Sequence, residues 1–270
     1  MNHSLQLADT SSALDPYFHD DRGFTLYQGD SLELMAQLES EQFDMIFADP
    51  PYFLSNGGMT CKNGRMVKVD KGDWDRSKGV QANHEFNLAW LAECQRLLKP
   101  NGTMFVSGTH HVIYSLGFAM QQLDFKVLND ISWFKVNPPP NLSCRYFTHA
   151  CETIIWAAKG QKSRYTFNYK QMKEMNGNKQ MKSLWSIMSP RKKEKLQGKH
   201  PTQKPMELLE RIVLAASDEG HSILDPFNGS GTTGLAAARH GRRYVGFDLS
   251  EEYLDLTERR YEAMFQPSLV

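Results

Sequence analysis

The chain has 270 residues, 40% of them hydrophobic, which is enough to bury the core of one large domain or of one domain with an inserted lobe. No apolar run approaches the roughly 18 residues of a membrane-spanning helix, and the first 20 residues lack the pattern of a signal peptide. The four cysteines form no Cys-x-x-Cys pair, so we expect a cytoplasmic protein without a disulfide framework.

The formal net charge is zero, but the basic residues are concentrated in one stretch. From Lys159 to Lys204, here called the basic block, there are 13 Lys or Arg residues and only two acidic ones, Glu174 and Glu194. Such a block is either a solvated surface or a footprint for a polyanion. Interleaved aromatic residues favour a nucleic acid over plain solvation. These are Tyr165, Phe167, Tyr169 and Trp185.

Residues 1–22 are polar and irregular, and we expect them to form a flexible N-terminal arm. Beyond them, strand and helix patterns alternate, which predicts an α/β fold with a doubly wound, mostly parallel sheet. The predicted strands are 25–30, 43–48, 103–107, 125–134, 152–158, 222–224 and 243–247, and the predicted helices are 31–39, 85–98, 112–123, 205–217, 233–240 and 250–264. Residues 53–83 have no clear period and are predicted to form a flap over the site.

The first informative motif is Asp49-Pro50-Pro51-Tyr52, which follows the apolar run 43–48. An Asp that ends a buried strand points to the carboxyl edge of the sheet, where open α/β sheets bind ligands. The prolines fix φ and lack N–H groups, so they hold the carbonyls of Asp49 and Pro50 outward. Two acceptors beside the ring of Tyr52 suit a planar base that carries an amino group. Taken alone, the motif is equally compatible with a turn that ends in a solvated Asp.

The second motif, residues 223–234, reads as a strand, a glycine-rich turn and a helix start. Its glycines let a ligand approach the backbone, and the helix start offers free N–H groups. Asp248 lies nineteen residues after Gly229, at the end of the next predicted strand, where it could accept hydrogen bonds from a ribose. The Gly-x-Gly-x-x-Gly spacing also occurs in NAD-binding sites. However, Asp225 precedes the glycines and places a carboxylate where an ammonium group could sit, which favours S-adenosylmethionine.

Together the two motifs resemble the amino-methyltransferases of DNA, the adenine-N6 and cytosine-N4 enzymes. The catalytic motif precedes the cofactor loop, as in the β class, and the likeness is strongest to DpnA-type adenine methyltransferases of GATC restriction-modification systems. Residues 137–149 and 200–205 are also similar to this family. The resemblance implies a circularly permuted, Rossmann-like methyltransferase fold with a basic target-recognition insertion. The implied domains are an N-terminal arm (1–22), a catalytic half (23–158), the insertion (159–199) and a cofactor-binding half (200–270).

By resemblance, the catalytic residues are Asp49, Pro50, Pro51 and Tyr52. Hydrogen bonds from the base amine to the Asp49 carboxylate and the Pro50 carbonyl would draw the nitrogen towards tetrahedral geometry and free its lone pair. The target base must leave the helix to reach them, and we expect it to stack on Tyr52, with Phe53 nearby. Asp rather than Ser at position 49 favours adenine over cytosine by the habit of the family.

The resemblance also implies the residues that bind the cofactor and DNA. For S-adenosylmethionine they are Asp30, Asp49, Thr202, Gln203, Lys204, Asp225, Pro226, Phe227, Asn228, Gly229, Gly231, Thr232 and Asp248. For DNA they are Phe53, Asn137, Pro139, Asn141, Arg145, Lys182, Arg191, Lys192 and Lys193. Asp30 would lie near the cofactor adenine, and residues 202–204 would hold the methionine carboxylate. Alternatively, Asp30 is a helix N-cap and Lys204 a solvated cation at a helix start.

No metal site is predicted, because Cys144, His149 and Cys151 lack a second ligand pair at the usual spacing. The sequence thus predicts a site-specific DNA methyltransferase that uses S-adenosylmethionine and acts on the N6 amine of adenine. A cytosine-N4 enzyme, a non-catalytic DNA-binding partner subunit and an NAD-linked oxidoreductase remain as alternatives. By analogy with the class we also expect a homodimer and a cognate restriction endonuclease.

Overall fold

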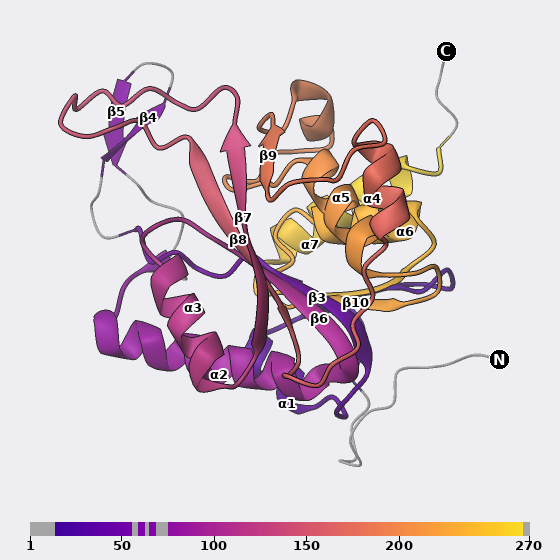
Figure 1. The fold of residues 1–270 in the computed structure, drawn as a ribbon. Helices are drawn as coiled ribbons and strands as arrows, with labels where there is room; N and C mark the ends of the chain where they lie inside the picture. The colour runs from indigo at the N-terminus through magenta and orange to yellow at the C-terminus, as the bar shows by residue number, and fades with distance from the viewer. Residues whose placement is uncertain (1–13, 56–58, 63–64, 69–74, 267–270) are drawn as a thin grey trace.

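The computed structural model describes residues 14–55, 59–62, 65–68 and 75–266 (Figure 1). Within these ranges no helix combines the length and the apolar character needed to cross a membrane. The helices are α1 (Ser31–Ala36), α2 (Val80–Leu97), α3 (Ile113–Gln122), α4 (Tyr169–Met175), α5 (Met206–Ala216), α6 (Thr232–Arg239) and α7 (Glu251–Ala263), with a 3-10 turn at Lys192–Lys195.

A nine-stranded sheet in the order β1-β2-β11-β10-β3-β6-β8-β7-β9 forms the centre of the fold. The strands are β1 (Phe18–Asp20), β2 (Phe24–Gln28), β3 (Phe43–Ala48), β6 (Leu98–Gly108), β7 (Lys126–Lys135), β8 (Cys151–Ala158), β9 (Leu184–Ile187), β10 (Ser222–Asp225) and β11 (Arg243–Asp248). The five strands from β2 to β6 in that order run parallel, whereas β8 is antiparallel to both β6 and β7. The predicted mixed α/β fold with a mostly parallel sheet is therefore confirmed.

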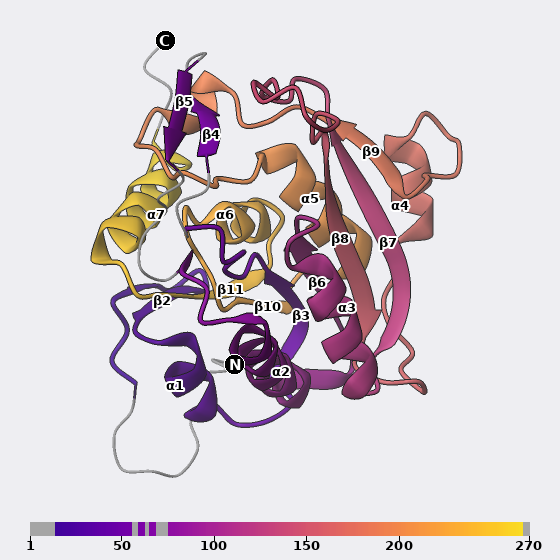
Figure 2. The same cartoon turned by 90° about the vertical axis from the view of Figure 1, so that its left-hand side faces the viewer.

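Helices cover both faces of the sheet (Figures 1 and 2). On one face α1, α2 and α3 bury residues such as Met35, Trp90 and Leu116 against it. On the other face α5, α6 and α7 contribute Leu209, Leu235 and other apolar side chains to a second core. The central parallel strands are thus buried on both sides, and this leaves the ends of the strands as the exposed places where polar residues can gather.

The N-terminal arm differs from its prediction in the described part. Phe18–Asp20 forms β1 and pairs antiparallel with β2. The hydroxyl of Tyr17 donates to Asp255 Oδ1 at 2.5 Å, and the ring of Phe18 lies 5.9 Å from that of Tyr261. The chain from Tyr17 onward is therefore part of the domain, because its aromatic rings pack on α7. Residues 1–13 of the predicted arm lie outside the described residues.

The predicted flap at 53–83 is described only in part. It contains an antiparallel hairpin of β4 (Met59–Lys62) and β5 (Arg65–Lys68), which the sequence did not predict. Residues 56–58, 63–64 and 69–74 lie outside the described residues. Helix α2 begins at residue 80, five residues before its predicted start.

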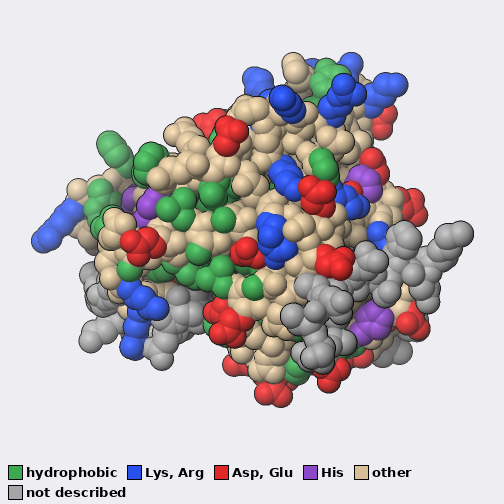
Figure 3. Space-filling view, turned by 90° about the horizontal axis from the view of Figure 1, so that it is seen from below, with side chains coloured by type: hydrophobic (Ala, Val, Ile, Leu, Met, Phe, Trp, Pro, Cys, Tyr) green, Lys and Arg blue, Asp and Glu red, His purple; other side chains and the backbone are tan. Residues whose placement is uncertain are grey.

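The basic block is not one continuous footprint. Lys159 follows β8, which runs opposite to β3, so its ammonium lies at the amino edge of the sheet and binds Glu41 Oε1 at 3.0 Å. Helix α4 follows at the same edge, where Asn168 N donates to Ala215 O at the end of α5. Strand β9 then runs parallel to β7 and returns the chain to the carboxyl edge. Figure 3 shows one group of Lys and Arg side chains along its upper border, while others lie at its left side and centre.

We predict that Gly234→Ala destabilises the fold by about 1–3 kcal/mol, because added core volume forces neighbours apart. A Cβ on Gly234 in α6 would lie 2.5 Å from Tyr244 Cε1 and 2.7 Å from Phe24 Cε2. The melting temperature should fall by about 2–4 °C per kcal/mol. Gly160→Ala is the control, since nothing lies within 4 Å of its Cβ position. Equal melting temperatures for the two variants would contradict this account of the packing.

Candidate active site

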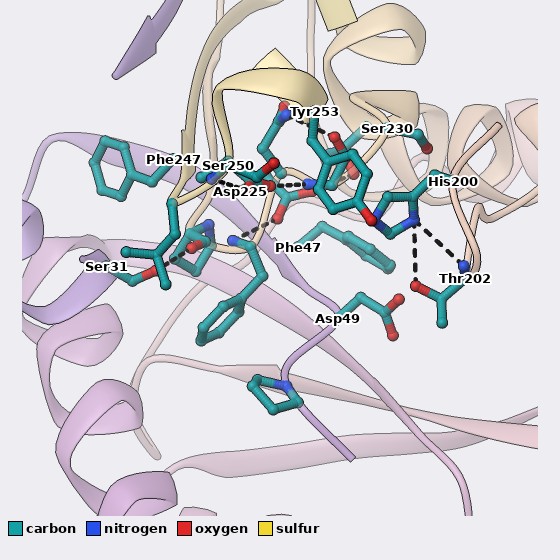
Figure 4. Close-up of a pocket in the computed structure, with 18 of the residues that line it drawn as sticks. Ser31, Phe47, Asp49, His200, Thr202, Asp225, Ser230, Phe247, Ser250 and Tyr253 are labelled. Atoms are coloured by element: carbon teal, nitrogen blue, oxygen red, sulfur yellow. Dashed lines mark hydrogen bonds between the residues drawn. The ribbon is translucent and has the colours of Figure 1, made fainter. Parts of the chain in front are cut away.

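A cavity of about 250 Å³ lies where β3, β10 and β11 end. Figure 4 shows the labelled side chains of Asp49, Asp225 and Ser250 around it, with Tyr253 beside His200. The predicted residues that line it are Asp30, Asp49, Pro51, Thr202, Lys204, Asp225, Pro226, Phe227, Asn228, Gly229, Thr232 and Asp248. The other lining residues are Ser31, Leu32, Phe47, Phe86, His200, Ser230, Thr233, Phe247, Leu249, Ser250 and Tyr253. Both sequence motifs therefore meet in one place, as parallel strands with neighbouring carboxyl ends require.

Asp49 is held by two charged or polar partners. Its Oδ2 accepts from Lys204 Nζ at 2.5 Å, and its Oδ1 accepts from the hydroxyl of Tyr52 at 2.6 Å. Tyr52 is only 6% exposed, and its ring belongs to the core beneath the helices α1 to α3. Little of the Tyr52 ring is therefore open in this structure, and its role as a stacking face for a base stays a prediction. Its hydroxyl orients the carboxylate of Asp49.

Glu152 extends this arrangement into a buried charge cluster that the sequence analysis missed. Its Oε1 accepts a hydrogen bond from Lys135, and its Oε2 lies 3.4 Å from Lys204 Nζ. Burial alone would raise the pKa of Glu152, but the ammonium groups of Lys204 and Lys135 lower it to about 2. Burial also opposes the charge on Lys204, yet Asp49 and Glu152 raise the pKa of that ammonium. The sequence does contain one indication of this cluster, because Glu152 is an acidic residue at the start of the otherwise apolar strand β8.

Asp75 was also missed, and it shapes the turn that follows Tyr52. This fully buried carboxylate accepts from Tyr52 N at 3.0 Å, Leu54 N at 3.1 Å and Ser55 Oγ at 2.8 Å. Between them, Phe53 adopts a left-handed backbone with φ of 57° and packs edge-on against Phe86. Asp75 thus fixes the backbone after the Pro-Pro pair. No local pattern in the glycine- and lysine-rich stretch around it predicts this role.

Two further carboxylates face the cavity with neutral partners. Asp225 accepts from Thr233 Oγ1 at 2.6 Å and from Phe227 N at 3.0 Å, and burial raises its pKa to about 7. Asp248 accepts from Gly229 N at 2.7 Å, and burial raises its pKa to about 6. A buried carboxylate that is stabilised mainly by neutral donors gains from a cationic or hydroxyl-bearing ligand. This part of the cavity therefore suits a positively charged molecule with hydroxyl groups.

Three predicted cofactor residues have structural roles instead or in addition. Asp30 caps α1 by accepting from Leu32 N at 2.9 Å, so the N-cap alternative is confirmed, although its side chain also lines the cavity. Gln203 is not among the residues that line the cavity, and its Nε2 donates to Glu194 O at 2.9 Å. Gly231 has φ of 69°, and a Cβ there would lie 2.2 Å from Thr257 Cγ2. That glycine is required by the packing of α7.

The predicted DNA-binding residues lie in the segments that follow β3, β7 and β9, except Lys182, which lies just before β9. Arg145, Lys182, Arg191, Lys192, Lys193 and Pro139 are exposed. Two asparagines are used within the protein: Asn137 Oδ1 accepts from Ser189 N at 3.4 Å, and Asn141 Nδ2 donates to Tyr146 O at 2.6 Å. In the described part of the chain, no group of three or more His, Cys, Asp or Glu side chains could hold a metal ion.

A family model described as DNA methylase matches residues 43–259. The chain belongs to the DNA methylase family. It is 53% identical over 249 residues to the type II methyltransferase M2.DpnII of Streptococcus pneumoniae, covering 92% of each protein. The family assignment removes the oxidoreductase alternative.

Solved structures agree with this DNA methyltransferase fold. The crystal structure of the M1.HpyAVI complex with S-adenosylmethionine matches with a TM-score of 0.66 and 27% identity, over 88% of this chain and 98% of that one. The PvuII cytosine-N4-specific DNA methyltransferase matches with a TM-score of 0.70 and 20% identity, over 92% of this chain and 88% of that one.

We predict that Glu152→Gln destabilises the methyltransferase by about 3–5 kcal/mol at pH 8, because it removes the carboxylate that pairs with Lys135 and leaves Asp49 alone to balance Lys204. The pKa of Glu152 is lowered on folding, so its stabilisation is present above about 4.5 and is lost as the pH falls towards about 2. Urea unfolding at several pH values measures both effects. Glu207→Gln, which removes an exposed i,i+4 pair with Arg211, should change stability by less than about 1 kcal/mol. If Glu152→Gln also lowers stability by less than about 1 kcal/mol, the buried charge cluster does not stabilise the fold as described.

Proposed function

We propose that this DNA methyltransferase transfers the methyl group of S-adenosylmethionine to the exocyclic N6 amine of an adenine that has flipped out of DNA. The observation that carries the proposal is the position of Asp49. Its carboxylate lies at the rim of a cavity that is also lined by the buried Asp225 and the half-buried Asp248, which suit a cationic cofactor. Asp49, the proposed acceptor for the base amine, is thus one of the residues that line the proposed cofactor cavity.

The residues present fit S-adenosylmethionine, which is the methyl donor. When bound, it supplies a methyl group on a sulfonium that is already activated for transfer. Asp248 would accept from the ribose, and Asp225 would face the positively charged part of the cofactor. Aromatic walls from Phe47, Phe227 and Tyr253 would exclude water from its rings. Thr202, whose hydroxyl and N–H both lie 3.3 Å from His200 Nδ1, would border the methionine end.

Asp49 positions and polarises the amine. The exocyclic nitrogen donates to the Asp49 carboxylate and the Pro50 carbonyl, which frees its lone pair for the methyl group. Methylation adds one bond to that nitrogen and removes one N–H proton, and Asp49 is the nearest carboxylate to take it. The amine must compete with Lys204 for Asp49. Glu152, at 3.4 Å from the same ammonium, gives Lys204 a second partner when the amine arrives.

Adenine is assigned because position 49 is Asp rather than Ser, whereas the fold is shared with a cytosine-N4 enzyme and does not decide the base. The relation to M2.DpnII supports a GATC site and a restriction-modification system with a cognate endonuclease. The bacterial origin of the similar methyltransferases supports a cytoplasmic location. A homodimer follows by analogy with the class alone.

We also propose that the fold is a circular permutation, with residues 23–158 as the catalytic half and 200–270 as the cofactor half. The support is that β3 precedes β10 by far in the sequence and yet pairs with it. Residues 159–199 are proposed as the target-recognition insertion. The part after β9, which returns to the carboxyl edge and exposes Arg191, Lys192 and Lys193, is the part placed to contact DNA phosphates.

The direct test is to incubate the protein with labelled S-adenosylmethionine and GATC-containing DNA and then to digest the product to nucleosides. We expect N6-methyladenine, and we expect Asp49→Ala to lower the rate by about 100-fold or more because it removes a preorganised acceptor. Asp21→Ala, on the exposed turn between β1 and β2, is the control. N4-methylcytosine as the product would reverse the base assignment. Full activity in Asp49→Ala would refute the role of the carboxylate.

We predict that cofactor affinity rises with pH. Asp225 and Asp248, with pKa values raised to about 7 and about 6, are mostly protonated at pH 5.5 and mostly ionised at pH 8. Only the ionised forms attract a cation, so the dissociation constant should fall about tenfold or more across this range. Calorimetric titration measures it. Asp225→Asn should remove the part of the slope near pH 7 and Asp248→Asn the part near pH 6, and a flat wild-type profile would contradict the assignment.

A further inference from the structure

The segment that joins β7 to β8, residues 136–150 and here called the aromatic loop, begins and ends at the catalytic cluster. Lys135, the last residue of β7, forms the buried ion pair with Glu152 near the start of β8. Lys135 N also donates to Ala150 O at 2.7 Å, which closes the base of the loop. In Figure 1 the trace continues past the arrowhead of β7 and away from the sheet before it returns as β8. The aromatic loop therefore projects from the rim where Asp49 lies.

The aromatic loop presents apolar side chains to solvent. Phe147 is 96% exposed, Tyr146 is 60% exposed and Leu142 is 39% exposed. Isolated apolar residues on a surface are ordinary, but two adjacent aromatic rings on one projecting loop are not explained by packing. Arg145 precedes them and is exposed as well. A cation beside two accessible rings is the combination that binds nucleic acid backbones and bases together.

The loop is also held in place from within. Asn141 donates through Nδ2 to Tyr146 O at 2.6 Å, and its Oδ1 accepts from Ser143 N at 3.0 Å. The ring of His149 stacks on that of His110, from the turn after β6, at 4.2 Å. These contacts order the loop before any partner binds, which lowers the entropic cost of using its rings for recognition. Asn141, which was predicted to contact DNA, thus stabilises the loop through hydrogen bonds within it.

We propose that Phe147, with Tyr146 beside it, stacks on the nucleobase faces that are exposed when the target base flips out. The inference rests on the proposed function, because flipping creates those faces. A flipped base leaves a gap in the stack, and apolar side chains that enter such gaps stabilise the opened DNA. A DNA partner is favoured over a second copy of this chain because the rings stand next to Arg145 and on a loop whose base adjoins the base-accepting carboxylate. The stacked faces belong either to the gap in a duplex or to neighbours in a single strand.

The test uses Phe147→Ala and oligonucleotides with 2-aminopurine in place of the target adenine, whose fluorescence rises on flipping. Duplex and single-stranded versions of the same sequence are compared. Stacking on one base contributes enough for its loss to weaken DNA binding by about 10-fold to 100-fold. We expect the variant to show this weakening and a smaller fluorescence rise. If Phe147→Ala weakens binding to the duplex alone, the stacked face belongs to the gap in the duplex. If it weakens binding to both the duplex and the single strand, the stacked faces belong to neighbouring bases. Phe147→Trp should retain binding.

Phe265→Ala is the matched control, since Phe265 is 47% exposed but follows α7, where its ring lies under Arg22 on the turn between β1 and β2. It should bind DNA like the wild type. Cofactor affinity and melting temperature should be unchanged in Phe147→Ala, because this side chain packs on little. Wild-type binding and flipping by Phe147→Ala would overturn the proposal. Failure of the wild-type enzyme to methylate the same DNA would instead overturn the proposed function, so the two outcomes are separate.

Discussion

The ion pair between Lys204 and Asp49 is the interaction on which the rest of the active site depends. Two ammonium groups, from Lys135 and Lys204, balance two carboxylates, from Asp49 and Glu152, in a region largely shielded from water. A buried charge is tolerated only when it is paired and hydrogen-bonded. These pairs join the end of β3, the end of β7, the start of β8 and the segment before α5. Chain segments about 150 residues apart are therefore held together at one point. In the proposed mechanism, that point is where the base amine binds.

The cavity contains two opposite electrostatic environments. Around Asp49 and Glu152 the protein supplies its own cations, and the pKa of Glu152 falls to about 2. Around Asp225 and Asp248 it supplies mainly neutral donors, and burial raises both pKa values. Asp225 and Asp248 can therefore take a cationic partner from a ligand, whereas Asp49 and Glu152 are already paired with Lys204 and Lys135. In the proposed mechanism, a cationic cofactor is therefore drawn to the end with Asp225 and Asp248, whereas the neutral amine of a base displaces an internal partner at the end with Asp49.

The strand ends could be predicted from the sequence, but their partners could not. Asp49, Asp225 and Asp248 each follow an apolar run, and parallel strands bring such residues to one edge. By contrast, Glu152 and Asp75 depend on contacts with residues many positions away, and Gly231 is required by Thr257 on another helix. The basic block was misjudged as one surface because charge along a sequence does not reveal which edge of the sheet it reaches. Antiparallel β8 leaves Lys159 at the far edge, and only β9 brings the later lysines back.

The same buried ion pairs also fix the position of Asp49 relative to the aromatic loop and the segment after β9, which are the surfaces proposed to contact DNA. The aromatic loop cannot shift at its base without separating Lys135 from Glu152, and it is tied to the segment after β9 where Asn137 accepts from Ser189 N. That segment is in turn fixed to the start of α5, where Met206 N donates to Glu194 Oε2 at 2.8 Å. Loops anchored in this way hold their exposed side chains at fixed positions relative to Asp49. Under the proposed function, the DNA adapts to this rigid rim by releasing a base, because a rim held in this way cannot follow a target that stays stacked.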